Sequence, residues 1–225
     1  MLKKQKNIKK RLNRHFFARP TLEVCKDILG KYLVHKIGKK KLIGKIVEVE
    51  AYIGPKDKAS HAVGGKMTKR NWAEFLEGGH VYIYLVYGMY WQFNISTGKK
   101  GSPECFLVRA LEPIIENSKS CPDKYQDKYQ DFSLSSKIRN SKLGEEIKNL
   151  ANGPGKLCQW MKLDKRHYGL DLTKSRELWI EDWGEKIPDS KIVRTKRIGI
   201  DYAGKYWASR KWRFYIKDNK FVSRL

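Results

Sequence analysis

Alternation of hydrophobic and polar positions runs through much of the chain and predicts mainly β-strands. Residues 31–37 (KYLVHKI) and 42–52 (LIGKIVEVEAY) alternate on either side of a GKKK turn, and we expect two paired strands there. Residues 81–86 (VYIYLV) and 89–96 (MYWQFNIS) alternate around Tyr87 and Gly88, a pattern typical of a β-hairpin. Further strands are expected at ECFLVRALEP, ELWIED, RIGI and WRFYI, with KDNK as a final hairpin turn before FVS.

Hydrophobic residues at helical spacing occur only in shorter segments. In residues 19–31, Leu22, Cys25 and Ile28 form an apolar stripe, with Thr21 as the expected N-cap and Gly30 as the end. Other short helices are expected at TKRNWAEFLEGG, EEIKNLA and LCQWMKL. Because strands dominate and no βαβ rhythm appears, the pattern predicts an α+β fold. We expect a single domain with a curved, largely antiparallel β-sheet, a protruding β-hairpin and surrounding helices.

Two polar segments interrupt this pattern. Residues 1–14 are rich in lysine and arginine, and we interpret them as a flexible basic arm that gains order on a phosphate backbone. Residues 117–142 contain a DKYQ duplication and predict an exposed polar segment rather than a domain boundary. We predict that residues 15–225 form a single domain.

Charge narrows the choice of partner. The 225 residues carry a formal net charge of +24, and such a surface repels itself unless a polyanion is present. Nucleic acid is the expected partner, and an anionic membrane surface is the alternative. The most apolar stretch is too short and too polar to span a bilayer, and the basic N-terminus lacks the apolar core of a secretion signal.

The cysteines indicate neither a disulfide framework nor a zinc site. Cys25, Cys105, Cys121 and Cys158 show no CxxC spacing, and no histidine pair stands at a metal-ligand interval. We therefore expect reduced thiols in an intracellular protein without a structural zinc site. We also expect no cofactor.

Two acidic residues stand inside a segment patterned like a buried strand. Glu48 and Glu50 alternate with Val47 and Val49, so the two acids share one face. Either that face is solvated and the acids are ordinary surface groups, or one of them is held in a pocket, where a partly desolvated carboxylate could activate a water. Arg109, in the apolar segment FLVRALEP, would need an acid or a phosphate as its partner.

Aromatic residues gather in the same part of the sequence. Tyr87 at the hairpin tip could insert between stacked bases, or it could fold back into the core. Tyr52, Tyr82 and Tyr84 could stack on a base, or they could line an ordinary sheet core. His61 has the same two interpretations. NGPGK lacks the full phosphate-loop pattern, and a turn between two helices is the simpler interpretation.

Several segments together resemble a known family. EAYIGPKDKASHA, HVYIYLVYGMYWQFNIS, CFLVRALEP, NGPGKLCQ and RIGIDYAG occur in family order, and the match runs from about residue 16 to residue 223. In these segments the chain resembles the mammalian-type alkyladenine (3-methyladenine) DNA glycosylases, a family also found in bacteria. EAYxGPxDxASH followed by YxxYGMYxxxNIS is a highly specific combination.

The resemblance implies a monofunctional repair enzyme without a metal. It would flip a damaged purine, alkylated and possibly deaminated, out of double-stranded DNA and hydrolyse the N-glycosidic bond, leaving an abasic site. By position, Glu50 would activate the catalytic water, and Arg109 with the backbone at Ile198 would help to hold that water. The implied protein is a cytoplasmic, nucleoid-associated monomer.

The same resemblance assigns the remaining site residues. The implied base pocket comprises Tyr52, His61, Tyr84 and Asn94, with Asn94 disfavouring the exocyclic amine of normal guanine. Tyr87 would intercalate, with Met89 and Tyr90 beside it in the groove. A two-residue turn at the hairpin tip would put Asn94 and Tyr84 on opposite faces, so we predict an odd-length loop or a bulge.

Two other functions stay open at this point. A non-catalytic sensor of distorted DNA would use Tyr87 and the basic surface while the pocket stays inert. An RNA-processing enzyme would use the same charge, because basic charge does not identify the sugar.

Overall fold

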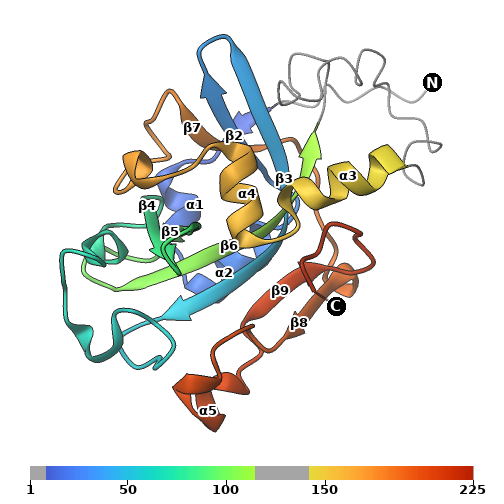
Figure 1. Cartoon of the computed structure of the whole chain (residues 1–225). Helices are drawn as coiled ribbons and strands as arrows, with labels where there is room; N and C mark the ends of the chain where they lie inside the picture. Colours follow the sequence, from blue (N-terminus) through green and yellow to red (C-terminus); the bar gives the residue numbers. More distant parts are fainter. Residues whose placement is uncertain (1–8, 115–141, 225) are drawn as a thin grey trace.

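A nine-stranded antiparallel sheet forms the centre of the molecule in the computed structural model, which describes residues 9–114 and 142–224 (Figure 1). Seven strands follow in the order β1-β7-β2-β3-β6-β5-β4, and β9 pairs with both β3 and β8. This architecture confirms the predicted α+β class. The strands of the described residues are β1 Lys10–Arg11, β2 Tyr32–Ile37, β3 Lys40–Ile53, β4 Val81–Val86, β5 Tyr90–Ser96, β6 Glu104–Ile114, β7 Leu178–Asp182, β8 Ile192–Thr195 and β9 Arg213–Ile216.

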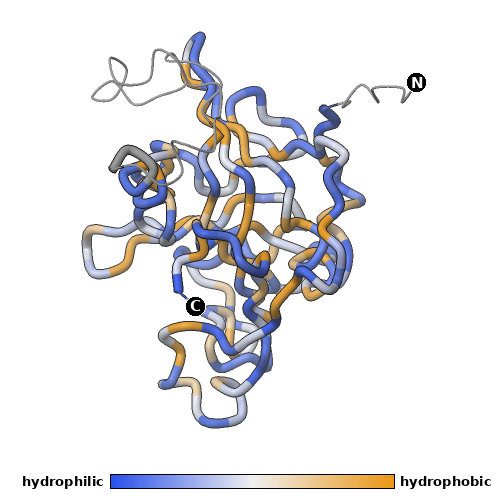
Figure 2. Tube along the Cα trace, turned by 90° about the vertical axis from the view of Figure 1, so that its right-hand side faces the viewer, coloured by the Kyte–Doolittle hydropathy of each residue, from blue (hydrophilic) through white to orange (hydrophobic). Residues whose placement is uncertain are grey.

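Helices cover the middle of the sheet. In the view of Figure 1, α4 crosses in front of β6, and α2 lies behind the sheet. Residues 46–51 of β3 are all buried, so both faces of this strand are covered. Figure 2 shows the hydrophobic segments crossing the middle of the body, while the turns at its edge are mostly hydrophilic. The α-helices of the described residues are α1 Arg14–Phe17, α2 Thr21–Asp27, α3 Lys142–Ala151, α4 Pro154–Met161 and α5 Lys205–Ala208.

The β4–β5 hairpin has the loop length that the sequence predicts. Val86 pairs with Tyr90, so three residues form the loop. Tyr84 then pairs with Gln92 and Tyr82 with Asn94, which places Tyr84 and Asn94 on one face of the hairpin. The odd-length loop is therefore confirmed.

Three local predictions are wrong. Thr21 is the first residue of α2 rather than its N-cap, and its buried hydroxyl contacts the hydroxyl of Thr97 at 2.6 Å instead. RIGI forms bends rather than a strand, because the Arg197 guanidinium is held by Asp57 and the chain turns there. FVS is not a strand either, since the backbone N–H of Ser223 donates to Glu48 instead of to a neighbouring strand.

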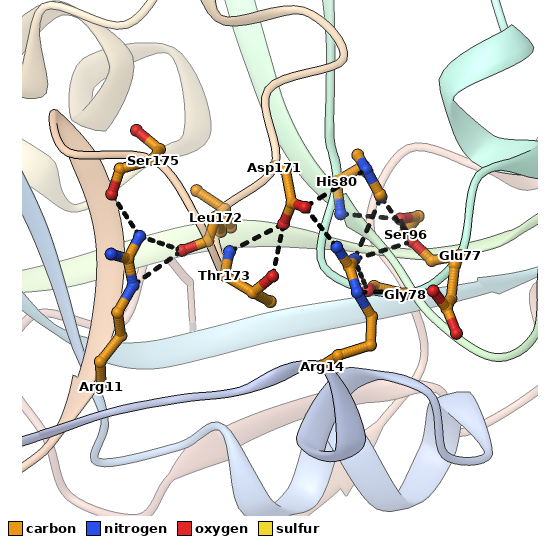
Figure 3. Close-up of polar contacts among 10 residues, drawn as sticks. All are labelled: Arg11, Arg14, Glu77, Gly78, His80, Ser96, Asp171, Leu172, Thr173 and Ser175. Carbon is orange, nitrogen blue, oxygen red and sulfur yellow. Dashed lines mark hydrogen bonds and ion pairs between the residues drawn. The ribbon is translucent and has the colours of Figure 1, made fainter.

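The chain is tied to the sheet earlier than the sequence suggests. Lys10 and Arg11, assigned to the basic arm by the sequence, pair with β7 as strand β1. Figure 3 shows Arg11 donating to the carbonyls of Leu172 and Ser175. Arg14 reaches the Asp171 carboxylate at 2.5 Å and the carbonyl of Gly78. These contacts fasten the N-terminal segment to the residues that lead into β7 and, through Gly78, to the loop that leads into β4.

Some predictions fall outside the described residues. Residues 1–8 of the arm, Cys121, and residues 117–141 of the polar segment belong to this group, while Lys142 begins α3. Across 9–114 and 142–224, no helix has both the length and the apolar character needed to cross a bilayer.

Candidate active site

A cavity of about 630 Å³ lies beside the β4–β5 hairpin. Its wall comes from β3, β4, β5 and β6, from the segment between β3 and β4, and from the loop that follows β8. Most of the site residues predicted from the sequence line it, namely Tyr52, His61, Tyr84, Tyr87, Asn94 and Arg109. Glu50, Met89 and Tyr90 lie outside this lining.

Aromatic rings form one side of the cavity. The rings of His61 and Tyr84 meet edge to face at 4.6 Å, and His61 Nδ1 lies 2.6 Å from the hydroxyl of Tyr82. Burial, and then the positive charge of Arg70, lower the pKa of His61, so its ring is neutral at pH 7. Burial also raises the pKa of both tyrosines, which stay neutral phenols. This side therefore offers flat, uncharged surfaces.

Glu50 lies directly behind the cavity wall. Its Oε1 accepts a hydrogen bond from the backbone N–H of Ile198 at 2.8 Å. Its Oε2 accepts from Arg109 Nη1 at 3.2 Å and from the Tyr52 hydroxyl at 3.0 Å. All three donors line the cavity, and the Glu50 side chain is fully buried. The carboxylate thus does not line the cavity itself but contacts three residues that do.

Glu48 serves a different purpose from its neighbour. Its Oε1 accepts from Arg213 at 2.7 Å and from Arg109 Nε at 3.0 Å, and Ser223 donates to both of its oxygens. Because Glu48 and Glu50 are both fully buried, the solvated-face interpretation is wrong. Glu48 connects β3 to β9 and to the last described residues of the chain.

Arg109 bridges the two acids. Its Nε faces Glu48 and its Nη1 faces Glu50. Burial opposes the charge of the guanidinium, but the two carboxylates outweigh it and raise the pKa of Arg109. The arginine expected to need an acidic partner therefore has two.

A second buried ion pair supports this site, and the sequence did not reveal it. Arg197 Nη2 lies 2.9 Å from Asp57 Oδ1, and Arg197 Nη1 donates to the carbonyl of Ala51 at 2.9 Å. The guanidinium also lies over the Tyr52 ring, 4.8 Å from its centre. Arg197 precedes Ile198, so this pair positions both the backbone donor to Glu50 and the Tyr52 ring. The only signal was the presence of both residues in the family-like segments.

Another acid, also missed by the sequence analysis, lines the cavity itself. Glu74 belongs to a short 3₁₀ turn, Trp72–Phe75, and is only 1% exposed. The Cys105 thiol donates to its Oε1 at 3.3 Å, and Oε2 has no hydrogen-bond partner among the described residues. Burial raises the pKa of Glu74 from 4.5 to about 7.

The hairpin tip projects beyond the cavity. Tyr87 is 86% exposed, so the alternative in which it folds into the core is wrong. Its φ of 52° and the φ of 70° at Gly88 both lie in the left-handed region, as in a type I′ turn, and the Met89 N–H donates to the Val86 carbonyl at 3.1 Å. Met89 and Tyr90 are also exposed, while Asn94 is buried and donates to the carbonyl of Gln92 at 3.0 Å.

An aromatic cavity backed by a buried carboxylate, on a strongly basic chain, is the arrangement expected of an enzyme that acts on single bases of nucleic acid. A family model described as methylpurine-DNA glycosylase (MPG) matches residues 15–220. The chain therefore belongs to the methylpurine-DNA glycosylase family, as its sequence motifs predicted. It is a DNA repair hydrolase that acts on the N-glycosidic bond.

Similar proteins carry a consistent name. A "Putative 3-methyladenine DNA glycosylase" of Clostridium novyi (strain NT) is 46% identical over 96% of this chain and 99% of its own length. The protein of the same name from Alkaliphilus oremlandii (strain OhILAs) is 45% identical over 95% of this chain and 99% of its own length. The similarity thus covers nearly the whole of each chain.

Proposed function

We propose that this protein rotates an alkylated purine out of duplex DNA into the cavity and hydrolyses its N-glycosidic bond, leaving an abasic site. The cavity volume, the flat aromatic side and the charge of +24 support this proposal.

Glu50 is the general base in this proposal. An ionised carboxylate has about four lone-pair positions, and three protein donors occupy three of them. The water takes the remaining position, or replaces the Tyr52 hydroxyl on Oε2 when that ring turns toward a bound base. This arrangement of three cavity-lining donors on one buried carboxylate is the observation that carries the assignment.

The reaction needs no further group. The water oxygen bonds to the anomeric carbon, the bond from that carbon to the purine nitrogen breaks, and its electron pair stays with the purine. Glu50 takes the proton of the water. A ring-alkylated purine already carries positive charge, so it departs as a neutral base. General base catalysis then contributes about 10²–10⁴-fold.

Selection of the damaged base rests on the cavity lining. Tyr52, His61 and Tyr84 stack on the base, and their electron-rich rings favour a cationic purine. Asn94 is buried and held by the Gln92 carbonyl, so it cannot retreat from the exocyclic amine of normal guanine.

Tyr87 fills the space that the rotated nucleotide leaves. Its exposure at the end of a hairpin supports a role as an intercalating wedge. Met89 and Tyr90 then contact the groove on either side of the gap.

A panel of duplexes, each with one modified purine, tests this function. The wild type should release free base from alkylated purines, without breaking the strand, and hypoxanthine duplexes show whether a deaminated purine is also released. Glu50→Gln should bind the same duplexes and lose base release by about 10²–10⁴-fold.

Glu104→Gln is the matched control for this variant. Glu104 belongs to β6 and lies outside the cavity lining, so its substitution should leave base release unchanged. Tight binding of damaged duplexes with no release of any base by the wild type would instead identify a sensor of distorted DNA.

A further inference from the structure

The cavity floor has a carboxyl group near each of its two ends. Cys105, Leu107 and Arg109, which alternate along β6, all line the cavity. Glu50 lies opposite Leu107 in the β3–β6 pair and contacts Arg109, whereas Glu74 contacts Cys105. Leu107 and Cys105 are two residues apart, so at about 3.3 Å per residue the backbone of Glu50 lies about 7 Å along the strand from the residue that Glu74 contacts. A base whose sugar lies at the Glu50 end therefore directs its far edge toward Glu74.

The Glu74 end of the cavity is unusual because its buried carboxyl group is not fully hydrogen-bonded by the described residues. Buried carboxyl groups are normally paired or fully hydrogen-bonded. Glu74 has one weak thiol donor, and its Oε2 has no partner among residues 9–114 and 142–224. A side chain of this kind destabilises the empty protein, which suggests that its partner arrives with the substrate.

We propose that Glu74 is a specificity-determining residue that receives the far edge of the rotated base and selects cationic alkylated purines over neutral lesions. This inference rests on the proposed function of the cavity. A buried carboxylate attracts a cationic ring strongly because little solvent screens the pair. A neutral lesion such as hypoxanthine gains no such attraction, and the protonated carboxyl then provides only ordinary hydrogen bonds.

The other groups near Glu74 do not titrate in the same range. They are the Cys105 thiol from β6, the Tyr82 and Tyr84 phenols from β4, and the Tyr168 phenol that follows a short turn near β4. Burial raises the pKa of each, so all four stay neutral at pH 7. The ring of His61, whose pKa is lowered by burial and then by the charge of Arg70, is neutral there too. Glu74, with a pKa of about 7, is the group in this neighbourhood that changes charge near neutral pH.

A pH dependence follows from this arrangement. Below pH 7 the carboxyl of the empty cavity is protonated, so binding a cationic base requires the loss of that proton. The preference for cationic over neutral lesions should therefore rise as the pH increases from 6 to 8 and then level off. A structural role for Glu74 would give no such dependence on the charge of the lesion.

The test compares 7-methylguanine with hypoxanthine in the same duplex. We expect Glu74→Gln to lower the ratio of the two release efficiencies by at least about tenfold, because one unit of pKa corresponds to tenfold in an equilibrium. The ratio of the variant should also become independent of pH. Glu74→Met removes the polar group altogether and should do the same, and Glu104→Gln, at the residue before Cys105 on β6, should behave as wild type.

The possible outcomes separate the two proposals. If the wild type releases no purine, the proposed function fails, and duplex affinities for the two lesions then test Glu74 directly with the same variants. If the wild type releases purines and neither Glu74 variant changes the ratio, this inference alone is wrong. A lower melting temperature in both variants, with equal losses on both lesions, would mean that Glu74 supports the fold, and it would also overturn the inference.

Discussion

Two buried acids beside one cavity are stabilised in opposite ways. Glu50 is surrounded by three donors, including a guanidinium. Among the residues that the structure describes, Glu74 has a single thiol donor and an oxygen without a hydrogen-bond partner. The pKa of Glu74 rises accordingly to about 7. A base for water needs a carboxylate held in place in advance, and a selector of charged bases needs a group that responds to the ligand. The contrast suggests that the hydrogen-bond partners of each acid fix its role: Glu50 acts in hydrolysis, and Glu74 acts in selecting the base.

The largest effect on stability should come from substituting Glu48. Glu48 and Glu50 are both buried on β3, so this variant tests a structural acid beside the proposed catalytic one. Glu48→Gln leaves two buried guanidinium groups, those of Arg109 and Arg213, without their shared charge partner. Breaking a buried pair costs about 3–5 kcal/mol, and urea unfolding should show a loss of that size. Equal stability of the variant and the wild type would mean that the Glu48 network contributes little.

A second effect concerns Glu74 and pH. The unfolded chain releases the proton of this residue near pH 4.5, whereas the folded protein keeps it until about pH 7. Between these values the folded state binds more protons, so the free energy of unfolding of the wild type falls as the pH rises. The fall contributed by Glu74 is about 3 kcal/mol and is complete above pH 7.

Glu74→Met should lack this decline. Its stability advantage over the wild type should grow from pH 4.5 to pH 7 and then stay constant, as measured by urea unfolding at a series of pH values. An advantage that shrinks over this range would show that Glu74 is ionised and paired in the folded protein.

A smaller effect is expected at the hairpin tip. Tyr87 is 86% exposed and has few contacts to lose, so Tyr87→Ala should leave the melting temperature unchanged. Loss of its stacking should weaken binding of damaged duplex by about 1–3 kcal/mol. Fluorescence anisotropy with intact and lesion-bearing duplexes measures this change. A variant that melts earlier and binds normally would identify Tyr87 as a structural residue.

The smallest effect should come from the Tyr52 hydroxyl. Tyr52→Phe keeps the ring for stacking and removes one donor from Glu50. Because a water can take the vacant position, base release should change by less than about tenfold, or about 1.4 kcal/mol. Single-turnover rates compare the variant with the wild type. A loss as large as that of Glu50→Gln would give the hydroxyl a direct part in the reaction.

Features that depend on a local sequence pattern could be predicted, whereas contacts between residues far apart in the sequence could not. Alternation reports burial on one face, so it located β2, β3, β4, β5, β6 and β7, and the loop-length argument placed Tyr84 and Asn94 together. The same reasoning misassigned RIGI, because Ile198 and Ile200 line the cavity from a bend instead of packing within a strand.

The residue pairs that support the site could not be predicted from local sequence patterns. Arg197 and Asp57 are 140 positions apart, and Glu74 and Cys105 are 31 positions apart. No local spacing joins residues that the fold brings together over such distances. A glutamate in a short 3₁₀ turn also gives no sign that it faces a cavity instead of solvent.

The central claim is that Glu50 carries out the chemistry and Glu74 selects the base. Its most direct test measures single-turnover release of 7-methylguanine and of hypoxanthine from matched duplexes. The proteins compared are the wild type, Glu50→Gln and Glu74→Gln. Loss of the Glu50 carboxylate should slow both reactions by a similar factor of about 10²–10⁴, whereas loss of the Glu74 carboxyl should slow mainly the cationic one. A Glu50→Gln protein that binds duplex and releases both bases at the wild-type rate would contradict the account.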